Sequence, residues 1–354
     1  MKQLIDRLAR DRHLTQTEWE QLIASRTPET AEYLFEKARS IRHDIYGKDI
    51  YIRGLIEFTN YCKNDCYYCG IRKSNRAAER YRLTKEEILS CCEVGYQLGF
   101  RTFVLQGGED VFFTDDKICE LISTIKTQYP DCAVTLSIGE KTKESYLAYY
   151  RAGADRYLLR HETADCSHYQ KLHPPSLSLE HRKACLWDLK EIGYQVGTGF
   201  MVGSPFQTSA HLAQDFKLIE ALQPQMVGIG PFVPHHDTPF ANQTGGCAEL
   251  TLFCIGLLRL LLPYALLPAT TALGTIHSHG RELGILSGAN VVMPNLSPLD
   301  VREKYLLYDN KLSTGEEAAE SLSSLSKSMK QIGYQVVVNR GDSKDPSFSP
   351  KQKP

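Results

Sequence analysis

The sequence predicts an α/β fold, a (β/α)8 TIM-type barrel with N-terminal helices and a short C-terminal extension, from three observations. Eight short apolar or β-branched runs alternate with helical stretches, as expected for parallel strands joined by helices. Three predicted helices end at a glycine before the next strand, at Gly99, Gly153 and Gly193, where a left-handed C-cap is needed. Polar or glycine-rich segments follow the strands. A doubly wound open sheet is the alternative, but it usually opens with a glycine-rich phosphate turn, which is absent here.

The predicted elements follow one another in a regular order. Residues 1–50 form an N-terminal helical segment, which could close the barrel floor, and the barrel covers residues 51–310. Residues 311–354 hold a polar helix, the stretch YQVVV and a Ser/Pro/Lys-rich end that we expect to be disordered. The strands are predicted at 52–58, 102–106, 133–138, 156–160, 195–200, 226–229, 265–268 and 290–293. The intervening helices are predicted at 85–98, 115–127, 143–151, 179–192, 209–221, 249–262 and 280–286.

Composition and charge exclude several classes of protein. The formal net charge of the 354-residue chain is −1, which gives no electrostatic footprint for nucleic acid or for an anionic membrane. The N-terminus has neither a signal-peptide nor a transit-peptide pattern, and the most apolar run contains Arg259 and Pro263 and is too short to span a bilayer. We therefore expect a cytoplasmic protein whose 11 cysteines are reduced.

Three cysteines, Cys62, Cys66 and Cys69, stand in a C-x3-C-x2-C run directly after the first predicted barrel strand. Thiolates bind the irons of a [4Fe-4S] cluster, and three of them would leave one iron open to a further ligand. An open metal position is typical of a site that does chemistry. The alternative is a zinc knuckle, which needs a fourth ligand from a second Cys or His pair, and no such pair stands nearby. The other cysteines are scattered and are interpreted as small apolar fillers.

The cysteine run, with Tyr68 before its third cysteine and Gly107-Gly108-Glu109 after the second strand, resembles the radical S-adenosylmethionine (SAM) enzymes. In that superfamily SAM chelates the open iron, and one electron breaks its C–S bond to give methionine and a 5′-deoxyadenosyl radical. Glycine carbonyls can approach the ammonium group of SAM closely because no Cβ intervenes. The glycine pair alone would indicate only a tight turn.

A finer resemblance involves the stretches YLLRHETA, MVGIGPFVPHHDTP, PATTALGT and GANVVMPN. They resemble the HydE family of [FeFe]-hydrogenase maturases, whose relatives are methylornithine synthase and biotin synthase. The resemblance implies an iron–carbonyl–cyanide–cysteine substrate, other maturation proteins as partners, and a reductant such as ferredoxin or flavodoxin. It implies SAM-binding roles for Tyr68, Gln106, Gly107, Gly108, Glu109, Ser137, Glu162, Arg182 and Met226, with Tyr68 and Met226 flanking the adenine. It implies catalytic positions beside the substrate for Arg160, Thr270, Thr271 and Tyr308.

Several alternatives stay open at this stage. Arg160 could instead be a structural ion-pair partner of Glu162, and the Thr270 and Thr271 hydroxyls could serve only the backbone. His235 and His236 resemble a metal pair but are interpreted as part of a turn. The C-terminal helix region contains no cysteine, so we expect one cluster and no second one. The alternative functions are a lysine mutase resembling methylornithine synthase and a non-catalytic iron–sulfur scaffold.

Overall fold

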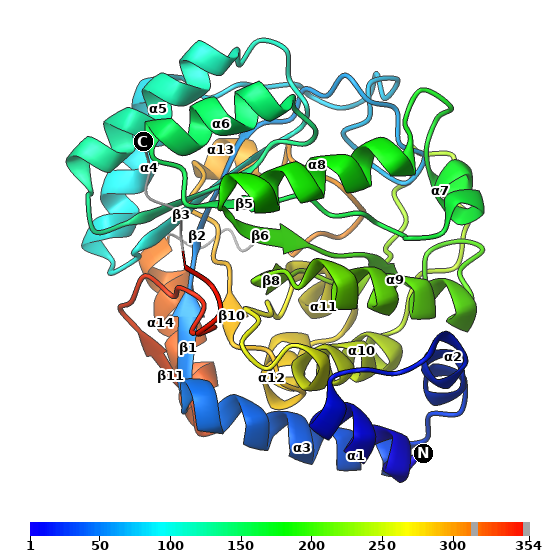
Figure 1. The fold of residues 1–354 in the computed structure, drawn as a ribbon. Coiled ribbons are helices and arrows are strands. Elements are labelled where there is room, and N and C mark those ends of the chain that lie inside the picture. The colour runs from blue at the N-terminus through cyan, green and yellow to red at the C-terminus, as the bar shows by residue number, and fades with distance from the viewer. Residues whose placement is uncertain (313–317, 350–354) are drawn as a thin grey trace.

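Parallel segments form a closed ring surrounded by helices in the computed structural model, which describes residues 1–312 and 318–349 (Figure 1). Six are strands of one sheet, in the order β2 (Gly54–Thr59), β3 (Thr102–Gly107), β4 (Ala133–Ser137), β5 (Arg156–Leu158), β6 (Gln195–Thr198) and β8 (Met226–Val227). The segment 265–268 and β10 (Val291–Val292) complete the ring through the bridges Met226–Leu266, Pro268–Val291 and Leu55–Asn295. The predicted barrel is confirmed, and the doubly wound alternative is wrong.

The seventh position of the ring differs from the expected strand. Residues 265–268 make only isolated bridges, at Leu266 and Pro268. Proline has no N–H to donate to a ladder, so it limits regular pairing at this position. Two short strands, β7 (Met201–Val202) and β9 (Gly230–Pro231), pair in parallel beyond the ends of β6 and β8. At the opposite end, β1 (Asp49–Ile52) pairs with both β10 and β11 (Gln335–Val337), which is the YQVVV stretch of the tail.

The helices that follow the strands form the outer layer of the barrel (Figure 1). The capping box predicted at Thr84 and Glu87 is present, and Gly153 and Gly193 are C-caps with positive φ. The long helices are α4 (Lys85–Gln97), α5 (Asp115–Gln128), α6 (Lys143–Ala152), α8 (Leu179–Ile192), α9 (Ser209–Leu222), α10 (Ala248–Leu261) and α14 (Ala318–Gln331). The short ones are α7 (Cys166–Leu172), α11 (Thr271–Ile276), α12 (Gly280–Leu286) and α13 (Leu299–Arg302).

The N-terminal helices α1 (Lys2–Asp11), α2 (Gln16–Ala24) and α3 (Pro28–Tyr46) pack mainly on the outer helices (Figure 1). Helix α2 lies against α9, where the Trp19 ring stacks on Phe216 at 4.4 Å between ring centres, and α3 lies against α10. The expectation that these helices close the barrel floor is therefore wrong for most of their length, because their apolar faces meet other helices.

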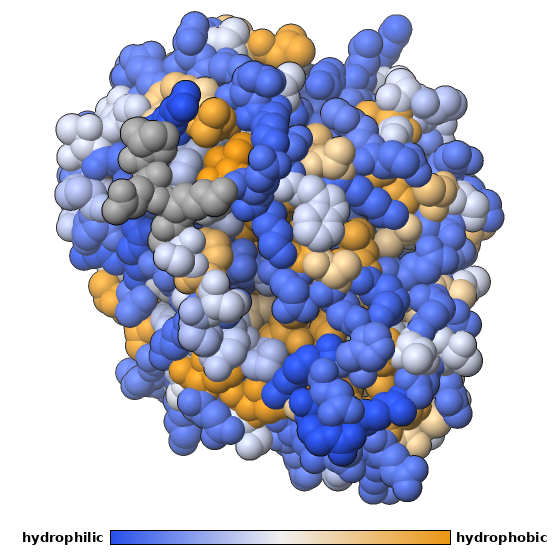
Figure 2. All heavy atoms as spheres, in the orientation of Figure 1, coloured by the Kyte–Doolittle hydropathy of each residue, from blue (hydrophilic) through white to orange (hydrophobic). Residues whose placement is uncertain are grey.

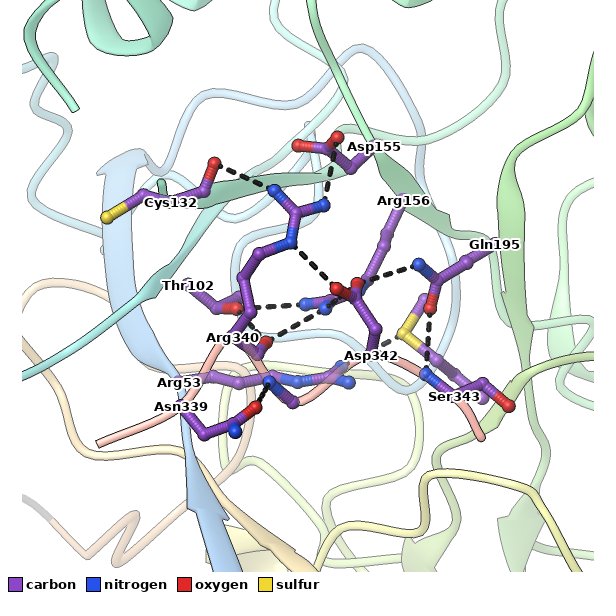
Figure 3. Close-up of polar contacts among 12 residues, drawn as sticks. Arg53, Thr102, Cys132, Asp155, Arg156, Gln195, Asn339, Arg340, Asp342 and Ser343 are labelled. Carbon is purple, nitrogen blue, oxygen red and sulfur yellow. Dashed lines mark hydrogen bonds and ion pairs between the residues drawn. The ribbon is translucent and has the colours of Figure 1, made fainter. Parts of the chain in front are cut away.

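A C-terminal segment closes the floor instead, at the amino ends of the strands (Figure 3). Arg156, the first residue of β5, pairs with Asp342 at 2.6 Å, and Gln195 donates to the same carboxylate at 2.8 Å. Arg340 pairs with Asp155 at 3.2 Å. Residues 340–343 are thus held beneath the barrel, while residues 350–354 of the tail expected to be disordered lie outside the described part of the chain.

The surface carries mixed polarity. The face drawn in Figure 2 is mostly hydrophilic, with apolar side chains at scattered places. Within the described ranges 1–312 and 318–349, every helix is too short or too polar to cross a bilayer. All 11 cysteines are free thiols.

Candidate active site

The loop after β2 carries the three predicted metal ligands. Asn60 fixes the start of this loop by donating to the carbonyls of Glu79 at 2.8 Å and Lys304 at 2.7 Å. The sulfur of Cys62 accepts the backbone N–H groups of Asn64 at 3.5 Å and Glu109 at 3.4 Å. Sulfur that accepts two N–H groups is suited to the thiolate form that binds metal.

The environment of the cysteines determines how they ionise. Burial raises the pKa of the Cys62 and Cys66 thiols, and burial with the nearby Cys62 raises the pKa of Cys69 to about 12. Buried thiols remain protonated at neutral pH until a metal displaces the proton. Three thiols on one half-buried loop therefore fit a soft metal site, and a bound metal would supply the positive charge that keeps them ionised.

A cavity of about 320 Å³ lies at the carboxyl ends of the strands, directly beside Cys69. A second cavity, of about 170 Å³, shares Gln106, Arg160, Thr270, Thr271 and Tyr308 with the first, so the two form one chamber inside the barrel. The structure brings most of the predicted site residues to its wall: Tyr68, Cys69, Gln106, Gly107, Ser137, Glu162, Arg160, Arg182, Thr270, Thr271 and Tyr308.

Glu109 and Gly108 lie behind this wall. The Glu109 carboxylate accepts the Glu140 N–H at 3.1 Å and pairs with Lys63 at 3.1 Å, so it ties the cysteine loop to the loop after β4. A Cβ on Gly108 would meet the Tyr61 carbonyl oxygen at 2.2 Å. Glycine is therefore needed here for the close approach of two loops.

Met226 is not at the site, and its predicted place beside the adenine is wrong. It begins β8, at the barrel floor, where its sulfur accepts a hydrogen bond from Arg53 at 2.9 Å. The apolar residues that do line the chamber near Tyr68 are Met201 and Phe232. Met201 follows β6 at the carboxyl end of that strand, where site residues of a barrel are expected. Sequence reasoning did not use this signal.

Two opposite charges on the chamber wall come from one strand end. The Arg160 guanidinium lies 3.1 Å from the Glu162 carboxylate, so the ion pair considered as an alternative is present. Both side chains nevertheless line the chamber, and Glu162 has a φ of 65°, a left-handed conformation that costs free energy for a residue with a Cβ. The buried Nε of Arg160 and Oγ1 of Thr270 have no hydrogen-bond partner among the described residues, and Nη2 of Arg160 and Oε2 of Glu162 have only each other.

Arg182 and Tyr68 are held firmly at the same wall. Arg182 bonds to the Glu140 carboxylate through Nε and donates to the Arg160 carbonyl at 2.9 Å through Nη1. The Tyr68 hydroxyl lies 3.2 Å from Nε2 of His173. Burial lowers the pKa of His173 to about 3, with a smaller contribution from Arg182, so the imidazole is neutral. Glu140 and His173 hold these two side chains but do not line the chamber themselves, and sequence reasoning did not single them out.

Comparison with known proteins agrees with this geometry. Residues 56–219 match the model of the radical SAM superfamily. The [FeFe] hydrogenase maturase subunit HydE of Thermotoga maritima is 45% identical over 302 residues, covering 85% of this chain and 86% of that protein. The chain belongs to the radical SAM superfamily. The 3-methylornithine synthase of Methanosarcina barkeri is 28% identical over 90% of this chain and 89% of its own length. The crystal structure of methylornithine synthase (PylB) superposes with a TM-score of 0.82, at 26% identity over 94% of this chain and 97% of that one.

Membership in this superfamily identifies the protein as an enzyme and implies a [4Fe-4S] cluster and SAM. The residues present fit both groups. Cys62, Cys66 and Cys69 offer three thiolates to iron. Glu162 and Arg182 offer an anion and a cation on one wall, as the two charged ends of an amino acid require.

Proposed function

We propose that this enzyme is a radical SAM maturase that acts on a small iron–carbonyl–cyanide–cysteine precursor during assembly of the [FeFe]-hydrogenase active site. The cluster and SAM supply a 5′-deoxyadenosyl radical when one electron is provided. Cys62, Cys66 and Cys69 hold the cluster in this proposal, and Glu162 and Arg182 hold the charged ends of SAM. Tyr68, Met201 and Phe232 provide the apolar wall that suits the adenine ring.

The proposal rests on one observation: the chamber wall carries arginine side chains whose hydrogen-bonding capacity is not fully used by the described residues. Nε of Arg160 has no hydrogen-bond partner in the described part of the chain, and Nη2 is held only by the ion pair with Glu162. Arg281 lines the deeper part of the same chamber, where burial lowers its pKa. Guanidinium groups that lack acceptors are suited to an anion, and cyanide ligands give the precursor negative charge.

The same wall argues against a lysine substrate. Lysine carries two ammonium groups, which need free carboxylates. Of the two acidic residues that line the described chamber, Glu57 is paired with Lys311 at 2.6 Å and Asn295 at 2.8 Å, and Glu162 is assigned in this proposal to the ammonium group of SAM. The relative in Thermotoga maritima, a hydrogenase maturase subunit by name, is also the more similar of the two at 45% against 28% identity.

The proposal includes one cluster only and a set of protein partners. Seven of the eight remaining cysteines lie on the described helices α4, α5, α7, α8 and α10 or at the N-cap of α10, and Cys132 directly precedes β4. They are dispersed around the barrel, whereas a second cluster needs several thiolates on one side. Other hydrogenase maturation proteins would supply and receive the precursor, and a ferredoxin or flavodoxin would supply the electron.

The test uses the full chain, reconstituted anaerobically with iron and sulfide. With dithionite and SAM, 5′-deoxyadenosine should form, and the protein should be needed to mature an apo-hydrogenase in a defined assembly mixture. Cys66→Ala should lose visible absorption of the cluster, iron binding and SAM cleavage together. The matched control is Cys166→Ala, at an exposed thiol on α7, which should retain all three.

Three results would contradict parts of the proposal. An intact cluster without SAM cleavage would favour the scaffold alternative. Conversion of lysine would favour a mutase resembling methylornithine synthase. Iron analysis giving two clusters per chain would overturn the single-cluster proposal while leaving the reaction untouched.

A further inference from the structure

Residues 160–164, which follow β5, place alternate side chains in two environments. Arg160 and Glu162 line the chamber, whereas His161 and Thr163 are fully buried and do not line it. Glu162 has a left-handed backbone conformation, with a φ of 65°. A residue with a Cβ keeps this conformation only where its surroundings fix it. The position of the Glu162 side chain therefore depends on the groups that hold the backbone on both sides of it.

One carboxylate of the outer helix layer holds both sides. Asp215 of α9 is fully buried, and its Oδ1 accepts the Ala164 N–H at 2.6 Å. The same Oδ1 lies 3.2 Å from Nε2 of His161, and Nδ1 of this imidazole lies 2.8 Å from the Thr198 hydroxyl on β6. A single oxygen atom thus contacts the residue before Glu162 and the second residue after it.

The protonation state of His161 fits this arrangement. Burial lowers the pKa of His161 to about 3, with smaller contributions from nearby arginine and lysine side chains, so the imidazole is neutral. A neutral imidazole has one N–H and one acceptor nitrogen. Because Asp215 Oδ1 is an acceptor, Nε2 carries the hydrogen and donates to it, and Nδ1 accepts from the Thr198 hydroxyl. The contact is a hydrogen bond that requires no charge on the imidazole.

Backbone contacts with the next strand of the ring complete the support. The Glu162 N–H donates to the Gly199 carbonyl at 3.0 Å, and the Glu162 carbonyl accepts the Met201 N–H at 3.2 Å. These bonds fix Glu162 relative to the segment after β6, whereas Asp215 fixes its neighbours relative to the outer layer. Helix α9 itself packs closely on α2. Asp215 is therefore held on a rigid element and contacts the segment from behind the chamber wall.

We propose that Asp215 is a positioning residue for SAM, because its contacts with His161 and Ala164 hold the Glu162 carboxylate at the chamber wall, where it receives the ammonium group of SAM. This inference rests on the proposed function, which assigns Glu162 to SAM. Asp215 does not line the described chamber, so it acts only through the segment that it holds. Loss of Asp215 should weaken the binding of SAM more than it slows the step that follows binding.

The first test measures the KM for SAM in the reconstituted enzyme. Asp215→Leu should raise this KM about tenfold, the effect of one lost hydrogen bond, and should change kcat by less than about twofold. Asp215→Asn keeps an oxygen that can accept both hydrogen bonds, and its KM should stay within about twofold of wild type. The matched control is Ile219→Ala, which removes a fully buried side chain one turn further along α9. It should lower stability and leave the KM unchanged.

A second measurement needs neither SAM nor turnover. In the reconstituted enzyme without SAM, hydrogen exchange of the Ala164 amide should be faster in Asp215→Leu, because the acceptor of this N–H is lost. Amides of β3 should change much less. In Ile219→Ala, any acceleration should affect both places alike. Thr198→Val removes only the hydroxyl that supports the imidazole, so it provides a milder variant if Asp215→Leu does not fold, and it should raise the KM about threefold.

The possible failures are distinguishable. A wild-type KM in both Asp215→Leu and Thr198→Val would overturn the inference, and so would a rise in Asp215→Asn as large as that in Asp215→Leu. Glu162→Gln tests the assignment on which the inference depends. A wild-type KM for SAM in Glu162→Gln would contradict that part of the proposed function. A raised KM in Glu162→Gln, together with a wild-type KM in Asp215→Leu, would contradict the positioning role alone.

Discussion

Each end of the barrel carries an arginine from β5 or from the residues that directly follow it, and the charge of the two arginines is balanced differently. At the floor, the Arg156 side chain is fully buried and bonds to Thr102 at 2.9 Å, to the Arg340 carbonyl at 2.9 Å and to Asp342 at 2.6 Å (Figure 3). At the mouth, the Arg160 side chain is 31% exposed, its Nη2 pairs with Glu162 at 3.1 Å, and its Nε has no hydrogen-bond partner among the described residues. Both Nη atoms of Arg156 have acceptors in the chain and only its Nε lacks one, whereas Arg160 lines the chamber, where a ligand can reach it.

The floor depends on one carboxylate more than on any other group. Arg53 is buried there as well (Figure 3), where its Nη1 donates to the sulfur of Met226 at 2.9 Å and its Nε and Nη2 have no hydrogen-bond partner among the described residues. Burial lowers the pKa of Arg53 far below its usual value, and Arg156 lowers it further, while Asp342 opposes both. Asp342 therefore offsets the charge of Arg156 and Arg340 directly and that of Arg53 at longer range.

The largest expected effect is that of Asp342→Ala on stability. The change would leave Arg156 charged and buried without a carboxylate, and breaking a buried pair in this way costs about 3 kcal/mol. Urea unfolding should show this loss in the free energy of unfolding. Asp345→Ala, a control in the same segment that removes a carboxylate bonded only to Ser347 nearby, should stay close to wild type. Equal stability of both variants would show that the floor does not depend on Asp342.

For Arg160→Met at the mouth, we expect a small effect on stability and a large effect on activity. Because Arg160 is only partly satisfied, its removal should change the free energy of unfolding by less than about 1 kcal/mol. Hydrogenase maturation should fall by about a hundredfold, because a charge-assisted contact to an anionic substrate is lost. Cleavage of SAM without substrate should persist. A loss of stability as large as that of Asp342→Ala would show that the Arg160–Glu162 pair is structural, and would remove the contrast between the two ends.

Sequence reasoning predicted the mouth far better than the floor. Strand ends could be located from short apolar runs, and all parallel strands present their carboxyl ends at one face. Cys69, Arg160, Glu162 and Thr270 were therefore expected together, and they meet at one chamber. The wrong place of Met226 beside the adenine came from the family resemblance, although the predicted strand 226–229 already began at this residue, as β8 does.

The floor could not be predicted because its contacts join residues far apart in sequence. Asp342 lies in a polar, proline-containing tail, whose composition alone is typical of disorder. It is held by Arg156 and Gln195, 186 and 147 residues away. No local pattern reports such a pairing. Glu109 shows the same limit at the mouth, since its carboxylate lies behind the wall because of contacts with Glu140 and Lys63.

A smaller effect is expected from pH. Burial alone would raise the pKa of Asp342, but Arg156 and Arg340 lower it well below its usual value. A carboxyl group with a depressed folded pKa contributes stability above its unfolded pKa of about 3.9, and that stability is lost as the pH falls from there. The difference in urea midpoint between wild type and Asp342→Asn should therefore be constant from pH 7 to pH 5 and shrink below about pH 4. A difference that does not change with pH would mean that Asp342 acts through hydrogen bonds alone.

The smallest effect concerns Thr270, which stands at the mouth beside Arg160. Thr270 is the N-cap residue of α11, yet its hydroxyl makes no capping hydrogen bond and is buried without a partner among the described residues. A hydroxyl that neither caps its helix nor bonds to the backbone is suited to a ligand. Thr270→Val should therefore leave stability within about 1 kcal/mol of wild type while raising the KM for substrate about tenfold, the value of one lost hydrogen bond. Thr271→Val is the matched control, and it separates the two hydroxyls that sequence alone left equal. If Thr270→Val lowers the melting temperature without changing KM, the hydroxyl stabilises the barrel and does not bind substrate. Arg160 would then be the one side chain at the mouth that supports the contrast between the two ends.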